Sequence, residues 1–411
     1  MSQINKLKIF NDPIYGFITL PNELIYDLVQ HRYFQRLRRI SQMGLSYLVY
    51  PGAHHTRFHH ALGCMHLMQK AVEVLRFKNV AISKDEEQAL YIAILLHDIG
   101  HGPFSHAMEN SIVEGVHHEQ LSLLFMNKLN EEFDGKLSLA IQIFKGEYHR
   151  RFMLQLISSQ LDMDRMDYLK RDSFFTGVAE GNINSDRLIQ MMAVVDDVLV
   201  IEEKGIYSVE KFLMARRLMY WQAYLHKTSL VAELMLMKIL QRAKQLTSHG
   251  IQLLCAEPLL YFICNKVQRE TFDGNMLEKF ARLDDFDIMS ALKNWQYHDD
   301  EILASLCRRI INRDLLKIKV SSDKFPKEDM QRLVSEFSAL HNIPEVDAKY
   351  FIFKGKIKNQ AYSAAVEPIH ILKKDKTIED VIEASDQLNL KALSKPVTKY
   401  YICFPKQLAE K

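Results

Sequence analysis

The sequence contains few of the residues that break or cross-link a chain. It has 15 Gly and 10 Pro in 411 residues, and no repeat or low-complexity linker. Its five cysteines are scattered, odd in number and free of CxxC pairs, which argues against a disulfide framework or a zinc knuckle. No segment approaches the roughly 20 apolar residues of a membrane span, and the first ten residues lack a signal core. We therefore predict a cytoplasmic protein with no membrane partner.

Net charge of either sign is also nearly absent. The chain has 53 basic and 51 acidic residues, a formal charge of +2, so nucleic acid is not indicated as a partner. A local basic pocket for an anionic ligand is still compatible with this balance. Apolar residues make up 48% and charged residues 25%, which is typical of a globular protein long enough for two or three domains.

The order of hydrophobic patterns predicts a mainly α fold. Residues 8–20 are typical of a hairpin, and residues 22–315 are mainly helical, except for a hairpin predicted over 198–209 that turns at Lys204-Gly205. Beyond residue 316, IKV, KYFIFKGKI and KYYICF are typical of strands, with helices predicted near 326–341 and 377–387. We expect a helical domain over 1–315 with small β-hairpins, and a smaller α+β C-terminal domain over 316–411 whose role is unknown.

A cluster of titratable residues, LLHDIGHGPFSH, follows a strongly apolar run. Ser83 and Glu86 have the spacing of a capping box, so ALYIAILL is expected to continue as a buried helix that ends at Gly102-Pro103. His97 and His101 would then share one face, beside Asp98. A buried carboxylate is costly unless it is paired or binds a metal. Histidine nitrogen and aspartate oxygen suit a divalent transition metal, and a metal-free His–Asp pair is the alternative.

Two further segments supply candidate metal ligands by their periodicity. In residues 57–75, His60 lies on the apolar side with Cys64, whereas His59 lies on the polar side. In residues 150–172, Asp164 falls on the apolar stripe, and Asp162 belongs to a less buried set. We expect Asp164 to face the core as a fourth ligand. Pairing of this carboxylate with an arginine is the alternative.

The ordered set His60, His97-Asp98 and Asp164 resembles the HD-domain metal-dependent phosphohydrolases. NDPIYG, QRLRRISQMGLSYLVYPGAHHTRFHHALG, LLHDIGHGPFSH, HHEQ and LDMDRMDYLKRD are similar to the sterile-alpha-motif/HD-domain deoxynucleoside triphosphate triphosphohydrolases and their bacterial relatives, over residues 8–240. The resemblance implies an enzyme that cleaves a dNTP at the α-phosphorus to deoxynucleoside and inorganic triphosphate. Mixed nitrogen and oxygen ligation by the four residues suits Fe, Mn, Zn or Ni, and we expect Mg to bind the phosphates in addition.

The resemblance also assigns residue roles. It implies that His101, His106 and His118 act in catalysis, with Glu109 where the family tends to have an aspartate. Histidine titrates in the range that a general acid needs, and the sequence does not decide between His106 and His118. The substrate contacts that it implies are Gln42 and Asp172 for the sugar hydroxyl, Arg57, Arg165 and Arg216 for the phosphates, and Tyr168 and Tyr224 around the sugar and base. Arginine suits phosphate because its planar fork binds in a bidentate manner.

A nucleotide effector site between subunits is implied by the same resemblance. Lys8, Gln35 and Arg38 match parts of it, but Gln30 stands where the family has an acidic residue that reads guanine. We expect a homo-oligomer, a dimer or tetramer, with a nucleotide effector as a further partner. Two other functions stay open. One is a different HD phosphohydrolase, such as a nucleotidase or phosphodiesterase, and the other is a non-catalytic nucleotide-binding protein that senses nucleotides or binds single-stranded nucleic acid.

Overall fold

The computed structural model describes residues 8–104, 108, 111, 115, 117–267, 272–365, 367–387 and 390–408. The strands are β1 (Ile9–Asp12), β2 (Gly16–Thr19), β3 (Met192–Val195), β4 (Val198–Glu202), β5 (Lys317–Ser321), β6 (Phe353–Asn359), β7 (His370–Leu372), β8 (Ile378–Asp380) and β9 (Val397–Phe404). The helices of the N-terminal part are α1 (Glu23–Gln30), α2 (Arg32–Gln35), α3 (Arg57–Phe77), α4 (Lys84–Leu96), α6 (His118–Glu132), α7 (Ser138–Phe144), α8 (Arg151–Ile157), α9 (Met163–Thr176), α10 (Ser185–Gln190) and α11 (Ile206–Met219). The later helices are α12 (Lys227–Ser248), α13 (Glu257–Cys264), α14 (Gly274–Ala281), α15 (Asp285–Trp295), α16 (Glu301–Ile311), α17 (Lys327–His341), α18 (Glu345–Ala348), α19 (Val381–Ala384) and α20 (Leu390–Leu393).

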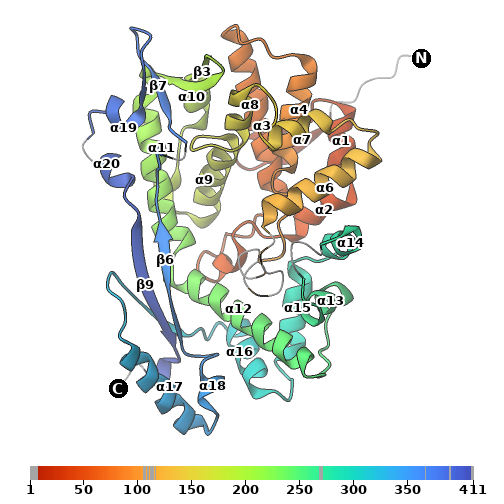
Figure 1. The fold of residues 1–411 in the computed structure, drawn as a ribbon, viewed down its shortest axis with the longest axis vertical. Helices are drawn as coiled ribbons and strands as arrows, with labels where there is room; N and C mark the ends of the chain where they lie inside the picture. The colour runs from red at the N-terminus through yellow and green to blue at the C-terminus, as the bar shows by residue number, and fades with distance from the viewer. Residues whose placement is uncertain are drawn as a thin grey trace.

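Short 3-10 turns join several of these helices. Together with the helices and strands they confirm the predicted fold class. The turns are η1 (Arg36–Arg39), η2 (Gly44–Leu48), η3 (Ala179–Gly181), η4 (Glu203–Gly205) and η7 (Lys406–Leu408), and η5 (Tyr220–Tyr224) is a π-helical turn. Figure 1 shows helices α1 to α9 at one end of the molecule and α12 to α16 at the other, with the long strands β6 and β9 along one side. The chain is thus mainly helical with small sheets.

Helix α4 is buried around its whole circumference from Ala89 to Leu96, and it packs against α3 and α7. Its predicted capping box is present: the Ser83 hydroxyl accepts from the amide of Glu86 at 3.1 Å, and the Glu86 carboxylate accepts from the amide of Ser83 at 2.7 Å. The predicted end at Gly102-Pro103 is wrong, because the helix stops at Leu96. Gly100 packs directly on the backbone of α6, where a Cβ would lie 2.3 Å from the His118 carbonyl oxygen. The chain must therefore leave the helix early to make this close approach.

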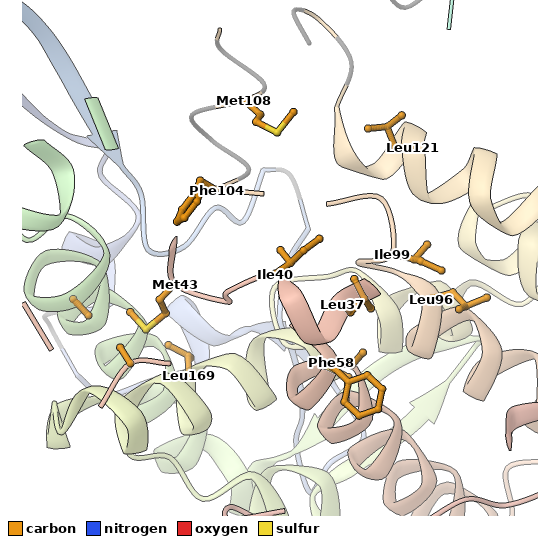
Figure 2. Close-up of a cluster of buried hydrophobic side chains, with 14 of the residues drawn as sticks. Leu37, Ile40, Met43, Phe58, Leu96, Ile99, Phe104, Met108, Leu121 and Leu169 are labelled. Atoms are coloured by element: carbon orange, nitrogen blue, oxygen red, sulfur yellow. The ribbon is translucent and has the colours of Figure 1, made fainter. Parts of the chain in front are cut away.

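Hydrophobic side chains from distant segments fix the turn that follows α4. Figure 2 shows Leu96 and Ile99 beside Leu37 of η1 and Phe58 of α3, all of them buried. Arg36, which is also fully buried, donates to the carbonyl oxygens of Ile99 at 3.3 Å and of His101 at 2.7 Å. These contacts hold the titratable turn rigidly against the core.

The segment expected to be one helix over 150–172 is two helices. Helix α8 ends at Ile157 and α9 begins at Met163, with Asp162 as the N-cap that accepts from the amide of Arg165 at 2.7 Å. The predicted burial is therefore reversed: Asp162 is fully buried, while the Asp164 side chain is 26% exposed. The periodicity did not predict these burials correctly because one helical repeat does not continue from α8 into α9.

The first predicted hairpin is confirmed as β1 and β2, but the second is displaced. Strands β3 and β4 pair around Asp196-Asp197, whose φ angles are +48° and +61°, instead of around Lys204-Gly205. Aspartate tolerates this left-handed conformation, which a tight hairpin requires. Lys204-Gly205 forms η4 and leads into α11.

The C-terminal strands are largely as expected, and two of them join the helical part. Strands β5, β9 and β6 form an antiparallel sheet, and α17 matches the helix predicted over 326–341. The helix predicted over 377–387 is wrong, since this segment begins as β8 and only 381–384 are helical. Strand β7 pairs in parallel with β4, so one sheet, β3-β4-β7-β8, spans the proposed boundary at residue 315. That boundary stays a prediction.

Candidate active site

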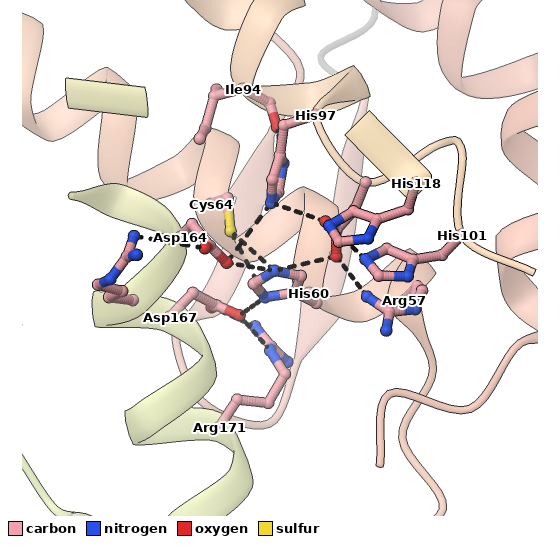
Figure 3. Close-up of polar contacts among 12 residues, drawn as sticks. Arg57, His60, Cys64, Ile94, His97, His101, His118, Asp164, Asp167 and Arg171 are labelled. Atoms are coloured by element: carbon pink, nitrogen blue, oxygen red, sulfur yellow. Dashed lines mark hydrogen bonds and ion pairs between the residues drawn. The ribbon is translucent and has the colours of Figure 1, made fainter. Parts of the chain in front are cut away.

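Three helices bring the four predicted metal ligands together (Figure 3). The Nε2 atom of His60 on α3 lies 3.0 Å from an Asp164 oxygen at the start of α9 and 3.7 Å from an Asp98 oxygen. The Nε2 atom of His97 lies 3.4 Å from Asp98 and 3.5 Å from Asp164. Ligand atoms bound at about 2.1 Å from one cation lie roughly 3 to 3.5 Å from each other. The spacing of these four atoms therefore fits a divalent metal site.

The orientation of both histidines supports the same assignment. The Nδ1–H group of His97 donates to the Ile94 carbonyl oxygen at 2.6 Å, and no described residue forms a hydrogen bond with its buried Nε2 atom. The Nδ1–H group of His60 donates to Asp167 at 2.8 Å. A metal-binding histidine is commonly held in this way, with one nitrogen anchored and the other left for the metal. The donor set of two imidazoles and two carboxylates suits a transition metal.

The two carboxylates of the cluster are held in the charged form. Burial acts to raise the pKa of Asp164, but the neighbouring His60 and His97 outweigh it and keep this pKa below its usual range. Burial opposes ionisation of Asp98 as well, and the nearby His101, His97 and Arg57 lower its pKa in the same way. Two charged oxygen ligands are therefore in place for a cation.

Cys64 also lies at this cluster, a position that the periodicity did not single out as a ligand. Its sulfur is 3.5 Å from Nδ1 of His60, and its side chain is fully buried. Burial raises the pKa of the Cys64 thiol well above its usual range. The sulfur nevertheless lies within 4.8 Å of the ligand atoms of His60, His97 and Asp164, and a bound metal would deprotonate it, so Cys64 is a further candidate ligand.

A buried ionic chain that the sequence did not reveal supports His60. The Asp167 carboxylate accepts from Arg171 at 2.9 and 3.0 Å, and Arg171 donates to Asp12 of the β1–β2 hairpin at 2.7 Å. Burial acts to raise the pKa of Asp167, but the charge of Arg171 and the hydrogen bond from His60 lower it to about 2. Gly63 makes room for this chain, because a Cβ there would lie 2.0 Å from Oδ1 of Asp167.

The predicted catalytic histidines are only partly within the described residues. His101 and His118 stack with ring centroids 3.9 Å apart, and Nε2 of His101 lies 3.2 Å from Asp98. Burial, with the charge of Arg57, holds the pKa of His101 well below its usual range, so this ring is neutral near pH 7. His106 and Glu109 lie outside the described residues, and their roles stay predictions.

The three predicted phosphate ligands are close to the metal cluster or to the residues around it. Arg57 donates to Asp98 at 2.5 Å, and Arg165 lies 4.0 Å from Asp164 while also bonding the N-cap carboxylate of α9. Arg216 on α11 donates to Gln160 at 2.9 Å. The Nε atoms of all three arginines are buried and have no hydrogen-bond partner in the part of the chain that the structure describes. Buried donors of this kind call for an acceptor, and a phosphate oxygen would supply one.

The predicted sugar and base contacts form one hydrogen-bonded group. The two Asp172 oxygens accept from Nε2 of His55 and from the Tyr224 hydroxyl, each at 2.6 Å, and Tyr224 packs edge-on against Tyr168 at 6.0 Å. The backbone amide of Gln42 donates to the carbonyl oxygen of His55 at 3.0 Å, and the buried Gln42 side-chain oxygen has no hydrogen-bond partner among the described residues. His55 was missed because nothing in its local sequence distinguishes it from the exposed His54.

Arg216 and Tyr224 do not lie on one continuous helix. Helix α11 ends at Met219, η5 follows, and α12 begins at Lys227. The wide π-helical turn places Tyr224 against Asp172, and such turns are frequent at functional sites. Arg216 and Tyr224 thus reach the same region from different helical segments.

The predicted effector residues lie on the surface near the N-terminus. Gln35 accepts from Nε of Arg38 at 2.9 Å, and the Arg38 guanidinium lies 3.6 Å from the Phe58 ring centroid. The Lys8 ammonium lies 3.0 Å from the centroid of Tyr26. Gln35 and Arg38 are adjacent, and the effector role of all three stays a prediction.

Comparisons with known proteins agree with this geometry. Residues 57–172 match the family model of the HD domain, and residues 183–255 match that of the HD associated region. The uncharacterized protein YwfO of Bacillus subtilis is 34% identical, over 99% of this chain and 94% of its own length. The crystal structure of a phosphohydrolase of Bacteroides thetaiotaomicron matches with 51% sequence identity and a TM-score of 0.94. The match covers 97% of this chain and 100% of the Bacteroides chain.

A more distant relative carries a specific activity in its name. The deoxynucleoside triphosphate triphosphohydrolase SAMHD1 homolog of Dictyostelium discoideum is 30% identical, over 60% of this chain and 51% of its own length. As for location, the described residues include no helix with the length and apolar character that crossing a membrane demands. The cytoplasmic location stays a prediction.

Proposed function

Because the chain belongs to the HD-domain metal-dependent phosphohydrolases, we propose that it is a deoxynucleoside triphosphate triphosphohydrolase. The reaction is attack of water at the α-phosphorus of a dNTP, with release of the deoxynucleoside and inorganic triphosphate. The single observation that carries the proposal is a set of buried polar atoms that have no hydrogen-bond partner among the described residues. These are the Nε atoms of Arg57, Arg165 and Arg216 and the side-chain oxygen of Gln42. Three cationic donors suit a polyphosphate chain, and a lone monoester phosphate has less use for them.

The sugar end of the proposed substrate has its own contacts. Asp172 is oriented by His55 and Tyr224, and each of its oxygens retains a lone pair for a sugar hydroxyl. Tyr168 and Tyr224 form an edge-to-face pair whose rings wall this region. Such a wall would exclude a 2′-hydroxyl by contact, which favours a deoxynucleotide.

Proton transfer to the leaving alkoxide is the remaining chemical task. Because its pKa is held low, His101 is neutral near pH 7 and is suited to orient a phosphate or water rather than to donate the proton. The general acid is then His106 or His118. A divalent cation held by His60, His97, Asp98 and Asp164 supplies Lewis-acid neutralisation of phosphoryl charge when bound. We propose Fe, Mn, Zn or Ni there, with Mg on the phosphates.

Regulation and assembly are further parts of the proposal. A nucleotide effector would bind near Lys8, Gln35 and Arg38, and the active form would be a homo-oligomer, a dimer or tetramer. Specific activity that stays constant across added nucleotides, with unchanged sedimentation, would contradict the effector part.

Product analysis tests the reaction. Purified protein is incubated with each dNTP and NTP, with and without divalent metal, and the products are separated by anion exchange. Triphosphate with deoxynucleoside supports the proposal. Orthophosphate released from a dNMP would instead support a nucleotidase, and intact nucleotides despite tight binding would support a binding protein.

A further inference from the structure

One face of the sheet β5-β9-β6 carries a row of lysines on each edge strand. Side chains alternate between the faces of a strand, and residues opposite each other in an antiparallel pair share a face. The register pairs Lys356 of β6 with Tyr400 of β9, and Lys319 of β5 with Ile402. Ser321, Thr398 and the buried Ile402 and Phe404 also lie on this face. We use the name lysine face for its five lysines and the ring among them: Lys317, Lys319, Lys354, Lys356, Lys358 and Tyr400.

The charges of the lysine face are not neutralised within the chain. All five lysines are exposed, and none of them forms an ion pair with a carboxylate in the part of the chain that the structure describes. Lys354 donates instead to the carbonyl oxygens of Phe325 at 3.2 Å and Pro326 at 3.3 Å. Like charges gathered in this way create a local positive field although the whole chain is nearly neutral.

An aromatic hollow opens among these charges. It has a volume of about 270 Å³ and is lined by Lys324, Phe325, Lys354, Lys356 and Tyr400, among others. The Lys324 ammonium lies 6.0 Å from the centroid of the half-buried Tyr400 ring. Rings surrounded by ammonium groups suit a ligand that has both a flat aromatic group and phosphate charges.

The spacing of the lysines favours an extended ligand over a compact one. Alternate residues along a strand are about 6.7 Å apart, so Lys354, Lys356 and Lys358 spread their charges along β6. The second row, on β5, lies about 10 Å away across the central strand. A single phosphate group would be held by donors that converge on one point, whereas this arrangement suits a chain of regularly spaced charges.

We propose that the lysine face binds single-stranded nucleic acid, with phosphates on the two rows of lysines and a base stacked at Tyr400. A duplex hides the faces of its bases, so only a single strand can use both the charges and the ring. The near-zero net charge predicts no such partner because it averages over the whole surface. The site is separate from the metal cluster, and the proposal does not depend on the proposed hydrolase activity.

Fluorescence anisotropy with a labelled 20-nucleotide single strand and the full chain tests the proposal. The single strand should bind with a salt-dependent affinity, since each phosphate contact contributes about −0.7 to the slope of log K against log [salt]. K356Q/K358Q should make this slope shallower by about 1.4. The matched control K136Q/K293Q neutralises two exposed lysines elsewhere and should bind as the wild type does.

The aromatic part has a separate readout. Y400A should weaken binding about 5- to 150-fold, and Y400F, which keeps the ring, should bind nearly as the wild type does. Circular dichroism of each variant checks the fold. The proposal is overturned if the wild type does not bind at low salt, or if K356Q/K358Q behaves as its control does. It is overturned equally if Y400A binds as tightly as Y400F, or if a duplex of the same length binds as tightly as the single strand.

Discussion

Gly63→Ala tests the buried ionic chain behind His60. In an ordinary helix interior this change stabilises by about 0.5 to 1 kcal/mol, because alanine restricts the unfolded chain. Here the new Cβ would lie 2.0 Å from Oδ1 of Asp167 and 2.3 Å from Nη2 of Arg171. Since such contacts essentially never fall below 3.0 Å, the Asp167 carboxylate must move by at least 1 Å. That displacement breaks hydrogen bonds of a pair that is fully buried.

The expected cost follows from these contacts. Disrupting a buried ion pair costs about 3 to 5 kcal/mol, so we expect Gly63→Ala to destabilise the protein by about 2 to 4 kcal/mol in urea unfolding. The anchor of His60 is lost with the pair, so metal affinity should fall about 10- to 100-fold, measured as metal content against free metal concentration. Asp167→Asn should have a similar effect, and the double variant should not be additive.

A matched glycine provides the control for Gly63. Gly274 also lies in a helix, α14, but a Cβ there would meet no atom within 4 Å. We expect Gly274→Ala to leave stability and metal content unchanged or slightly improved. If Gly63→Ala proved as stable as Gly274→Ala and retained its metal, the ionic chain would have no part in holding His60.

Three other changes address the metal, the substrate and the pH dependence of stability. Asp164→Ala removes a charged ligand, so metal content should fall below half of the wild-type occupancy and turnover should be lost. Elemental analysis measures the metal content, and a normal value would contradict the ligand assignment. Arg216→Lys keeps the positive charge but removes the planar guanidinium group that can form two parallel hydrogen bonds to a phosphate. We expect kcat/KM for a dNTP, measured by triphosphate release, to fall about 10- to 100-fold. An unchanged value would show that Arg216 does not belong to the phosphate site. Asp285 is buried, and burial raises its pKa to about 6, even though it accepts from the amide of Ser41 at 2.8 Å. A carboxyl whose folded-state pKa is raised binds its proton more tightly in the folded state, so its contribution to stability falls as pH rises from about 4 to 6. The free energy of unfolding of Asp285→Asn should therefore rise relative to that of the wild type by up to about 3 kcal/mol as pH increases across that interval. A difference between the two proteins that is constant with pH would refute the buried-acid interpretation.

The fold was predictable wherever local patterns decide it. The capping box of Ser83 and Glu86, the β1–β2 hairpin and the strands β5, β6 and β9 could be predicted because each depends on residues close together in the chain. The errors lie where a local pattern was extended across a break. The helix predicted over 150–172 failed because the buried N-cap Asp162 starts a second helix. The hairpin predicted over 198–209 failed because the turn lies earlier in the chain, at Asp196-Asp197.

The site shows the same division. The sequence by itself determined which residue types are available for metal and phosphate, and their motifs were sufficient to bring His60, His97, Asp98 and Asp164 into one hypothesis. Only the tertiary structure decided that Asp167 and Arg171 fix the His60 ring, and that His55, 117 residues away along the chain, orients Asp172. The physical reason is that ligand chemistry belongs to the side chain and can be read one residue at a time. Orientation, by contrast, comes from contacts between segments that meet only when the core packs.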